Sequence, residues 1–202
     1  MNIINRQSHG SMSYEEYSKY NGITNTDLGD LSRKLAHAYR PDLRDAFAYG
    51  TAVDAAITQP SKLHFADKYY VIAQRKKALA HSIPHISKFI EISKKQQMFS
   101  AVIEIDGKPR TVKCLADLSS RNALGDIKTT ACVTDTSFRK SCKQLGYYRQ
   151  SAWYMNIVGV DVMYLIGLSK RADSVFLECV RRGDANYEYG MNEIQSLLQY
   201  MK

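Results

Sequence analysis

The stretch KCLADLSSRNALGDIKTT, residues 113–130, contains two short apolar segments separated by the polar sequence SSRN. Segments of this kind on either side of a polar turn predict two strands joined as a hairpin. Strand side chains alternate between the two faces, so Asp126 and Lys128 would share one face. Antiparallel pairing would bring Asp117 beside Asp126. The stretch therefore predicts two carboxylates and one ammonium group close together on a hairpin.

The surrounding sequence predicts further strands and thus a sheet. Asp106-Gly107 is a strong signal for a two-residue turn between strands at 99–105 and 111–118. A strand at 124–130 would complete an antiparallel meander, and two more strands are expected at 161–168 and 174–181. Helices are expected before, between and after these strands. This order predicts an α/β (α+β) fold in which helices flank a mixed central sheet.

Helix signals occupy most of the remaining chain. Ser13 and Glu16 form a capping box for a first helix, and Thr24 or Asn25 can cap a second helix that ends at Pro41. Further helices are predicted at 42–60, at 62–97 with a break near residue 84, at 137–158 as one long helix, and at 193–200.

The composition is that of an ordinary folded protein with a basic balance. The 202 residues are 45% hydrophobic, which fits one domain over 1–202, with 1–12 expected to be flexible. Lys and Arg outnumber Asp and Glu by 28 to 20, which favours an anionic partner such as nucleic acid. The four cysteines form no C-x-x-C pair, so no zinc or iron–sulfur site is indicated. Without a secretion signal or membrane-length apolar run, a cytoplasmic protein that does not bind membranes is expected.

Two acids and a lysine at this spacing have a specific chemical use. Carboxylates bind hard divalent ions such as Mg²⁺, and a neighbouring ammonium group can orient an attacking water and offset phosphate charge. Acids at strand ends also occur as caps or as solvated groups. The lysine two residues after Asp126 favours the metal-and-water interpretation.

The predicted long helix adds a polar and aromatic stripe. Steps of three and four residues place its members on one face, where they could contact phosphates and base edges. The alternative is a half-exposed helix whose tyrosine hydroxyls reach water. The members of the stripe are Arg139, Lys143, Tyr147, Gln150 and Tyr154.

These motifs resemble those of the PD-(D/E)XK nuclease superfamily, in its branch of exodeoxyribonuclease VIII and phage lambda exonuclease. The resemblance extends over about residues 14–182. It includes a lead-in at 17–28 and the sequence YGTAVD at 49–54, which is similar to a Gly-Thr-Ala-x-His helix of the branch. The central motifs are Asp117, then Gly125-Asp126-Ile127-Lys128-Thr129-Thr130, then Tyr147-x-x-Gln150-x-x-x-Tyr154.

The resemblance implies a restriction-endonuclease-like core and assigns roles to residues. Asp117 and Asp126 would bind Mg²⁺ or Mn²⁺, Lys128 would position the water, and Gln150 would support the catalytic site. A lead-in hydroxyl would help to hold a 5′ phosphate. The residues expected to contact DNA are Thr24, Thr26, Arg139, Lys143, Tyr147 and Tyr154.

Two positions depart from the pattern of this branch. Asp126 stands where the branch often has Glu, and Asp54 stands where the exodeoxyribonuclease VIII type has a metal-binding His. Asp is an equally good oxygen ligand for a hard ion, so Asp54 is predicted to complete a three-carboxylate metal site. The alternative is that Asp54 has a structural role only.

The implied activity is that of a divalent-metal-dependent deoxyribonuclease that resects double-stranded DNA ends 5′ to 3′ in phage-type recombination. The resemblance also implies a ring-shaped homo-oligomer, a trimer or tetramer, and a single-strand annealing protein as partner. Three alternatives remain open. They are an endonuclease of the same superfamily, a CRISPR-adaptation nuclease, which the scattered cysteines disfavour, and a DNA-binding module that keeps the fold without catalysis.

Overall fold

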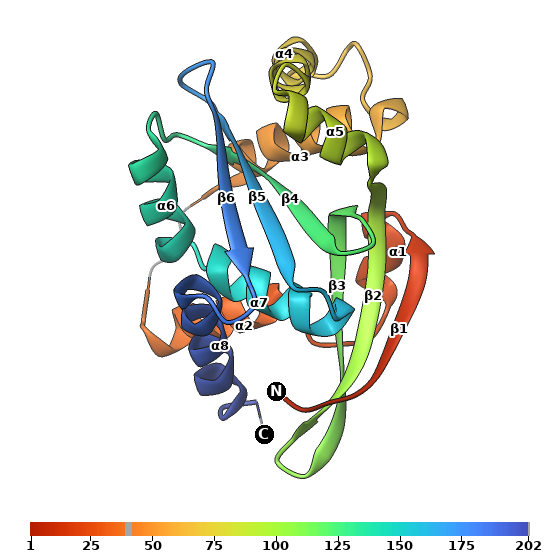
Figure 1. The fold of residues 1–202 in the computed structure, drawn as a ribbon, viewed down its shortest axis with the longest axis vertical. Coiled ribbons are helices and arrows are strands. Elements are labelled where there is room, and N and C mark those ends of the chain that lie inside the picture. Colours follow the sequence, from red (N-terminus) through yellow and green to blue (C-terminus); the bar gives the residue numbers. More distant parts are fainter. Residues whose placement is uncertain (39–41, 202) are drawn as a thin grey trace.

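The computed structural model describes residues 1–38 and 42–201, which form one six-stranded mixed sheet with helices on both faces (Figure 1). The strands lie in sequence order across the sheet. All neighbours are antiparallel except β4 and β5, which are parallel. The predicted mixed sheet is thereby confirmed. The strands are β1 (Ile3–Ser11), β2 (Lys94–Ile105), β3 (Lys108–Ser119), β4 (Ala123–Thr130), β5 (Val162–Ser169) and β6 (Val175–Arg181).

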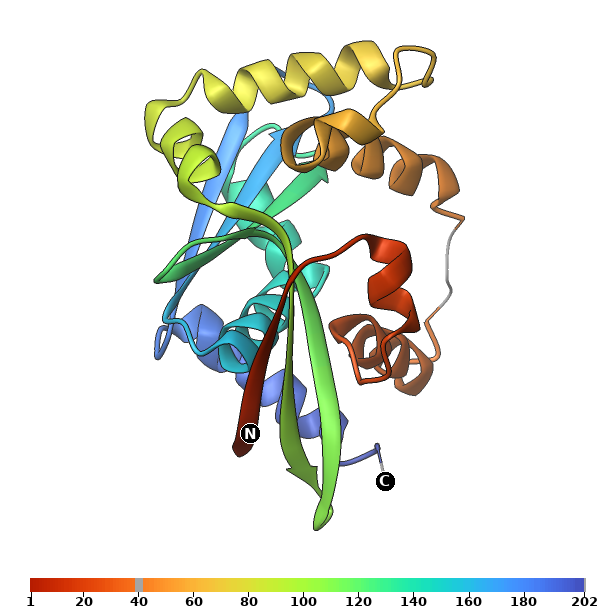
Figure 2. The ribbon, with the colours of Figure 1, turned by 90° about the vertical axis from the view of Figure 1, so that its right-hand side faces the viewer.

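The helices form groups that lie in different parts of the molecule (Figures 1 and 2). Three helices and a 3-10 turn cover one end of the sheet: α3 (Arg44–Thr58), η1 (Pro60–Lys62), α4 (Tyr70–His81) and α5 (Pro84–Ile92). A second group is α6 (Asp135–Gln144), α7 (Tyr147–Val158) and α8 (Ala185–Leu198). The short helices α1 (Tyr14–Lys19) and α2 (Asn25–Leu35) follow β1.

Two hydrophobic cores hold these helices against opposite faces of the sheet. The side chains of β5 alternate between the cores, with Met163 and Leu165 in the core that includes α7 and α8. Ile166 and Leu168 belong to the core that includes α3, α4 and α5. Trp153 of α7 is fully buried in the first core. The alternation explains why β5 is apolar along most of its length, since both of its faces are covered.

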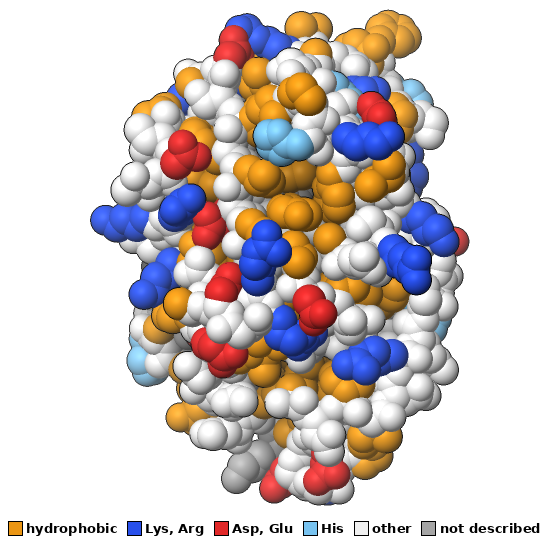
Figure 3. Space-filling model, in the orientation of Figure 1, with side chains coloured by type: hydrophobic (Ala, Val, Ile, Leu, Met, Phe, Trp, Pro, Cys, Tyr) orange, Lys and Arg blue, Asp and Glu red, His pale blue; other side chains and the backbone are white. Residues whose placement is uncertain are grey.

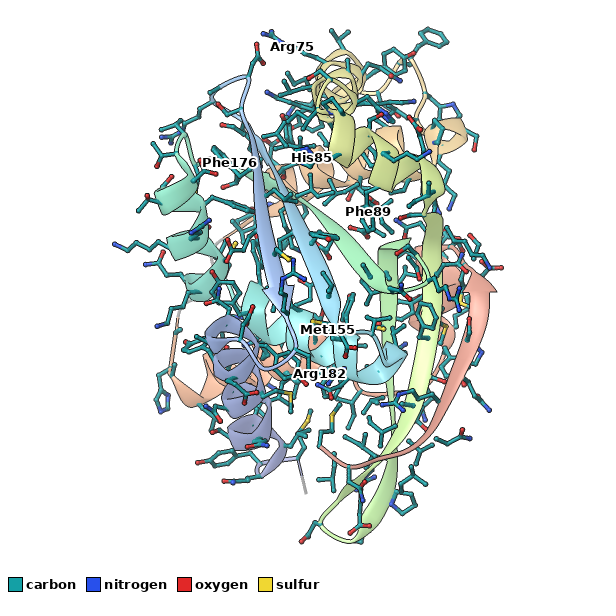
Figure 4. The ribbon with its side chains drawn as sticks, viewed as in Figure 1. Arg75, His85, Phe89, Met155, Phe176 and Arg182 are labelled. Carbon is teal, nitrogen blue, oxygen red and sulfur yellow. The ribbon has the colours of Figure 1, made fainter. Side chains whose placement is uncertain are left out.

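Two further contacts fix helices relative to the strands that carry the site. Phe89 of α5 lies against Gly125 of β4, where any larger residue would collide with its ring (Figure 4). At the other end, the Arg182 guanidinium donates to the backbone oxygens of Met155 and Val160, at 3.3 and 2.8 Å (Figure 4). Arg182, which directly follows β6, therefore ties that strand to the C-terminal end of α7.

Residues 1–12, expected to be flexible, instead include β1. This strand pairs with β2 from Ile3 to Ser11. Its sequence is largely polar and its side chains are mostly exposed, so no apolar alternation marked it. Backbone hydrogen bonds to β2 define the strand. The strand β2 is longer than predicted for the same reason, because its first residues are polar. It begins at Lys94, whereas a helix was predicted to run to residue 97.

The single helix predicted at 137–158 is wrong, because the segment is divided into α6 and α7. Gly146 lies between them with φ +70°, a left-handed conformation that interrupts a right-handed helix and that glycine adopts readily. The break reorients the residues on either side of it. The five-residue stripe therefore does not exist as one face.

Other helix signals are confirmed. The Ser13–Glu16 capping box is present, Thr24 caps α2, and the break before Pro84 separates α4 from α5. Leu43, and not Asp42, is the N-cap residue of α3, but the Asp42 carboxylate accepts a hydrogen bond of 3.1 Å from the backbone nitrogen of Arg44, the first helical residue. Pro41, expected to end the second helix, lies outside the described residues. No helix in the described ranges is long and apolar enough to cross a membrane.

We predict that Gly190→Ala destabilises the protein by about 1–3 kcal/mol, the usual range for overpacking a core. A Cβ at Gly190 of α8 would overlap the backbone carbonyl of Tyr148 in α7, which cannot move aside like a side chain. Chemical denaturation would measure the change. The exposed Ser196→Ala of the same helix is the control, with a change within about 0.5 kcal/mol. A more stable Gly190→Ala variant, as helix propensity alone would give, would contradict this packing.

Candidate metal-dependent active site

The predicted hairpin of β3 and β4 is present, and its two strands separate at Asp117 and Asp126. The strands pair only at Leu118 with Gly125 and at Ser119 with Leu124. Continuation of that register places Asp117 opposite Asp126, where the strands have already separated. The carboxylate of Asp117 accepts a hydrogen bond of 2.8 Å from the backbone nitrogen of Ile127. A side chain thus replaces the next rung of the ladder and keeps Asp117 beside β4.

Asp126 is buried and is held between two side chains. Nε2 of Gln150 on α7 donates to Oδ1 of Asp126 at 2.6 Å, and Nζ of Lys128 lies 2.6 Å from Oδ2. The ammonium group also lies 4.6 Å from the centre of the Tyr147 ring, in a cation–π contact. Asp126 and Lys128 share a face of β4, as predicted. Gln150 and Tyr147 close this side of the site from α7.

Asp54 is positioned by the opposite group of helices. Its carboxylate Oδ2 accepts from Nε2 of Gln96 at 3.1 Å, and Oδ1 accepts from the Thr58 hydroxyl at 3.3 Å. Thr58 lies one turn after Asp54 on α3, and Gln96 is in β2. Asp54 is therefore held by donors on both sides, and it approaches the hairpin from α3.

The electrostatics show that these acids influence one another. Burial, and then the negative charge of Asp126, raise the pKa of Asp54 from its ordinary 3.8 to about 6. Burial, followed by the charges of Asp54 and Asp126, raises the pKa of Asp117 well above its usual range. Burial lowers the pKa of Lys128, but Asp126, Tyr147 and Asp117 together outweigh burial, so the pKa of Lys128 is raised. If all three carboxyl groups were ionised, they would carry more negative charge than the one ammonium group balances, and the raised pKa values of Asp54 and Asp117 reflect this.

The donor set suits a hard divalent cation, although no ligand cage is already formed. Carboxylate oxygens are the ligands that Mg²⁺ and Mn²⁺ prefer. Oδ2 of Asp126 is buried, and among the described residues its charge partner is the Lys128 ammonium group, 2.6 Å away. Within residues 1–38 and 42–201, no three His, Cys, Asp or Glu side chains are grouped closely enough to hold one ion together. Asp54, Asp117 and Asp126 as joint metal ligands remain a prediction.

The remaining predicted residues lie in different surroundings. Arg139 pairs with Glu178 of β6 at 3.1 Å, and Lys143 lies over the Tyr189 ring of α8, so both are on the α6 side of the helix break. The Thr24 hydroxyl is used in the α2 capping box with Asp27, and Thr26 is exposed in the first turn of α2. Tyr154 is largely buried beside the site, where burial raises its pKa well above the usual range. Roles for these residues in DNA binding are not tested.

Sequence reasoning missed Thr58 and Gln96. Thr58 follows Asp54 by four residues on a predicted helix, which is a readable signal for a side-chain contact. Gln96 had no such signal, because its contact joins segments 42 residues apart and its segment was interpreted as helix.

Comparisons with known proteins give structural neighbours but no sequence relatives. No model of a known protein family matches the chain, and no curated protein matches it. An alkaline exonuclease from Laribacter hongkongensis is 14% identical, with 92% of this chain and 90% of that chain covered and a TM-score of 0.40. A phage-related exonuclease from Haemophilus somnus 129PT is 12% identical, with 91% and 95% covered and a TM-score of 0.44. With identities this low and TM-scores below 0.5, the proposed function rests on the residues of the site.

We predict that Asp54→Asn stabilises the metal-free protein at neutral pH by about 1–3 kcal/mol, since a shift of one pKa unit corresponds to about 1.4 kcal/mol. Between pH of about 4 and 6, the folded wild type binds a proton at Asp54 that the unfolded chain releases. Its free energy of unfolding therefore falls as pH rises through this window, whereas the amide escapes the penalty.

Denaturation in a chelator, at several pH values, would measure this difference. The gain of the variant should be absent below about pH 4 and complete above about pH 6. Asp106→Asn, at an exposed turn, is the control and should show no such pH dependence. A pH-independent difference for Asp54→Asn would show that the buried charge of Asp54 does not oppose folding.

Proposed function

We propose that the protein is a divalent-metal-dependent deoxyribonuclease with its active site at Asp54, Asp117, Asp126, Lys128 and Gln150. One observation supports this most directly. Asp126 is buried between the amide of Gln150 and the ammonium group of Lys128. The charges of Asp126 and Asp54 are close enough to Asp117 to raise its pKa, after burial. A structural ion pair would need one carboxylate for one lysine. Three carboxyl groups near one lysine favour a further cation, whose charge would replace the protons that the raised pKa values of Asp54 and Asp117 indicate.

Each residue has a defined task in phosphodiester hydrolysis. Bound Mg²⁺ or Mn²⁺ would supply Lewis acidity and neutralise charge on the phosphate. Gln150 fixes the orientation of Asp126 through Oδ1. Lys128 can donate from Nζ to the attacking water or to a phosphate oxygen, which stabilises the negative charge that develops there. The Tyr147 ring limits where this ammonium group can move, because it lies against one side of it.

The sequence resemblance favours an exonuclease that acts on double-stranded ends, and the charge supports a nucleic-acid substrate. The net charge of +8 attracts polyanions. On the face shown in Figure 3, Lys and Arg side chains are scattered among acidic ones and form no single patch. A ring-shaped homo-oligomer and an annealing partner remain predictions. An endonuclease or a non-catalytic DNA-binding module is the competing function.

We predict that the protein degrades linear duplex DNA in Mg²⁺ and leaves covalently closed circles intact. An exonuclease needs an end, whereas an endonuclease does not. Gel assays with matched linear and circular forms of one plasmid, with and without chelator, would measure this. Cutting of circles would identify an endonuclease. Tight binding without cleavage of either form would contradict the proposed enzymatic activity.

We predict that Asp126→Asn and Lys128→Met each lower the cleavage rate by about 10²–10³-fold, the range for loss of one preorganised electrostatic group. Unfolding midpoints would show whether the fold is kept. Lys140→Met, which removes an exposed lysine from α6, is the matched control and should keep nearly full activity. Wild-type rates in either site variant would remove this site from the mechanism.

A further inference from the structure

Gln96 stands out as a buried polar residue with an unusual backbone conformation inside a strand. Its φ is +48°, and it is only 6% exposed. A left-handed residue other than glycine is strained and persists only where its surroundings hold it. Such positions cluster at functional sites. Gln96 follows α5 by a few residues, at the start of β2 (Figure 1).

Its place in the sheet is next to the proposed active site. In the pairing of β2 with β3, Lys95 lies opposite Leu118 and Gln97 opposite Ala116. The same register puts Gln96 opposite Asp117. Gln96 is therefore the residue of β2 that stands level with the acids of the hairpin.

The amide of Gln96 makes two hydrogen bonds with the polar groups of α3. Nε2 donates to Oδ2 of Asp54 and to Oγ1 of Thr58, both at 3.1 Å. An amide nitrogen carries two hydrogens, one for each acceptor. The Thr58 hydroxyl in turn contacts Oδ1 of Asp54 at 3.3 Å. The three side chains are in mutual contact, and the Gln96 amide donates to both of the others.

The alternative is that Gln96 only satisfies buried polar groups. That role would not require strain, since the single hydrogen of the Thr58 hydroxyl already has two acceptors on Asp54, the backbone oxygen at 3.0 Å and Oδ1 at 3.3 Å. The neighbouring Gln97 shows the simpler arrangement. It is 7% exposed, and its amide donates to the backbone oxygen of Lys95 at 2.8 Å without reaching the site.

We propose that Gln96 is a positioning residue for the metal site: its amide orients the Asp54 carboxylate toward the space shared with Asp117 and Asp126. This inference rests on the proposed metal-dependent function. Outer partners of a metal ligand typically affect metal affinity by 10–100-fold, because they fix the orientation of the ligand before the ion binds. Loss of the amide should therefore weaken metal binding without removing a ligand.

The test is a titration of the full chain with Mn²⁺, in which electron paramagnetic resonance measures the free ion. Gln96→Met keeps side-chain length and removes both donors, and we expect its Kd for Mn²⁺ to rise at least about tenfold. Gln97→Met is the matched control and should bind as the wild type does. Gln96→Gly is the second variant, because glycine accepts φ +48° without strain and so protects against a failure to fold.

The possible results separate this inference from the proposed function. The positioning role is supported if both Gln96 variants bind Mn²⁺ more weakly than the wild type and at least one of them has the unfolding midpoint of the wild type. Wild-type affinity in a folded Gln96 variant, together with loss of binding in Asp126→Ala, overturns the positioning role alone. Absence of Mn²⁺ binding by the wild type overturns both. Equal weakening by Gln97→Met would show a general effect on β2 and would also overturn the inference.

Discussion

The clustering of three carboxyl groups, removed from water and close to one another, is the constraint on which the site depends. Asp54, Asp117 and Asp126 lie close enough for their charges to raise pKa values, with Lys128 as the neighbouring cation. Such a group opposes folding unless each acid is separately held. The protein meets this need with donors from different elements. A backbone amide of β4, an amide from α7 and a pair of side chains from β2 and α3 each hold one acid.

This division of donors explains why both faces of the sheet must be covered. The core with Trp153 and Met163 fixes α7, and so places Gln150 against Asp126. The core with Val53 and Ile166 fixes α3, and so brings Asp54 to the hairpin from the opposite direction. The open end of the β3–β4 pair lies between them, where Asp117 replaces a ladder hydrogen bond. A site of this kind needs both packed layers, because α3 supplies Asp54 from one side and α7 supplies the amide that holds Asp126 from the other.

The parts of the site that the sequence predicted are those defined by local geometry. Alternation along a strand placed Asp126 with Lys128, and hairpin pairing placed Asp117 beside them. Tyr147 and Gln150 both lie within α7, so their predicted position on one helix face did not depend on where the helix begins. The prediction that Arg139 and Lys143 lie on one face with Gln150 was wrong. Their alignment with Gln150 needed a continuous helix, and the left-handed Gly146 removes that continuity.

What the sequence could not predict depends on contacts between distant segments. β1 has no apolar pattern, yet its end supports the strained start of β2. The Met12 amide donates to the backbone oxygen of Gln96 at 2.9 Å, and the Ser11 hydroxyl donates to that of Lys95 at 3.1 Å. The carbonyl groups of the peptides that precede and follow the left-handed Gln96 are thus both held. A polar strand with exposed side chains can in this way contribute to the geometry around Asp54. Its contribution comes through hydrogen bonds to backbone carbonyl groups of β2, which no apolar pattern in the sequence reports.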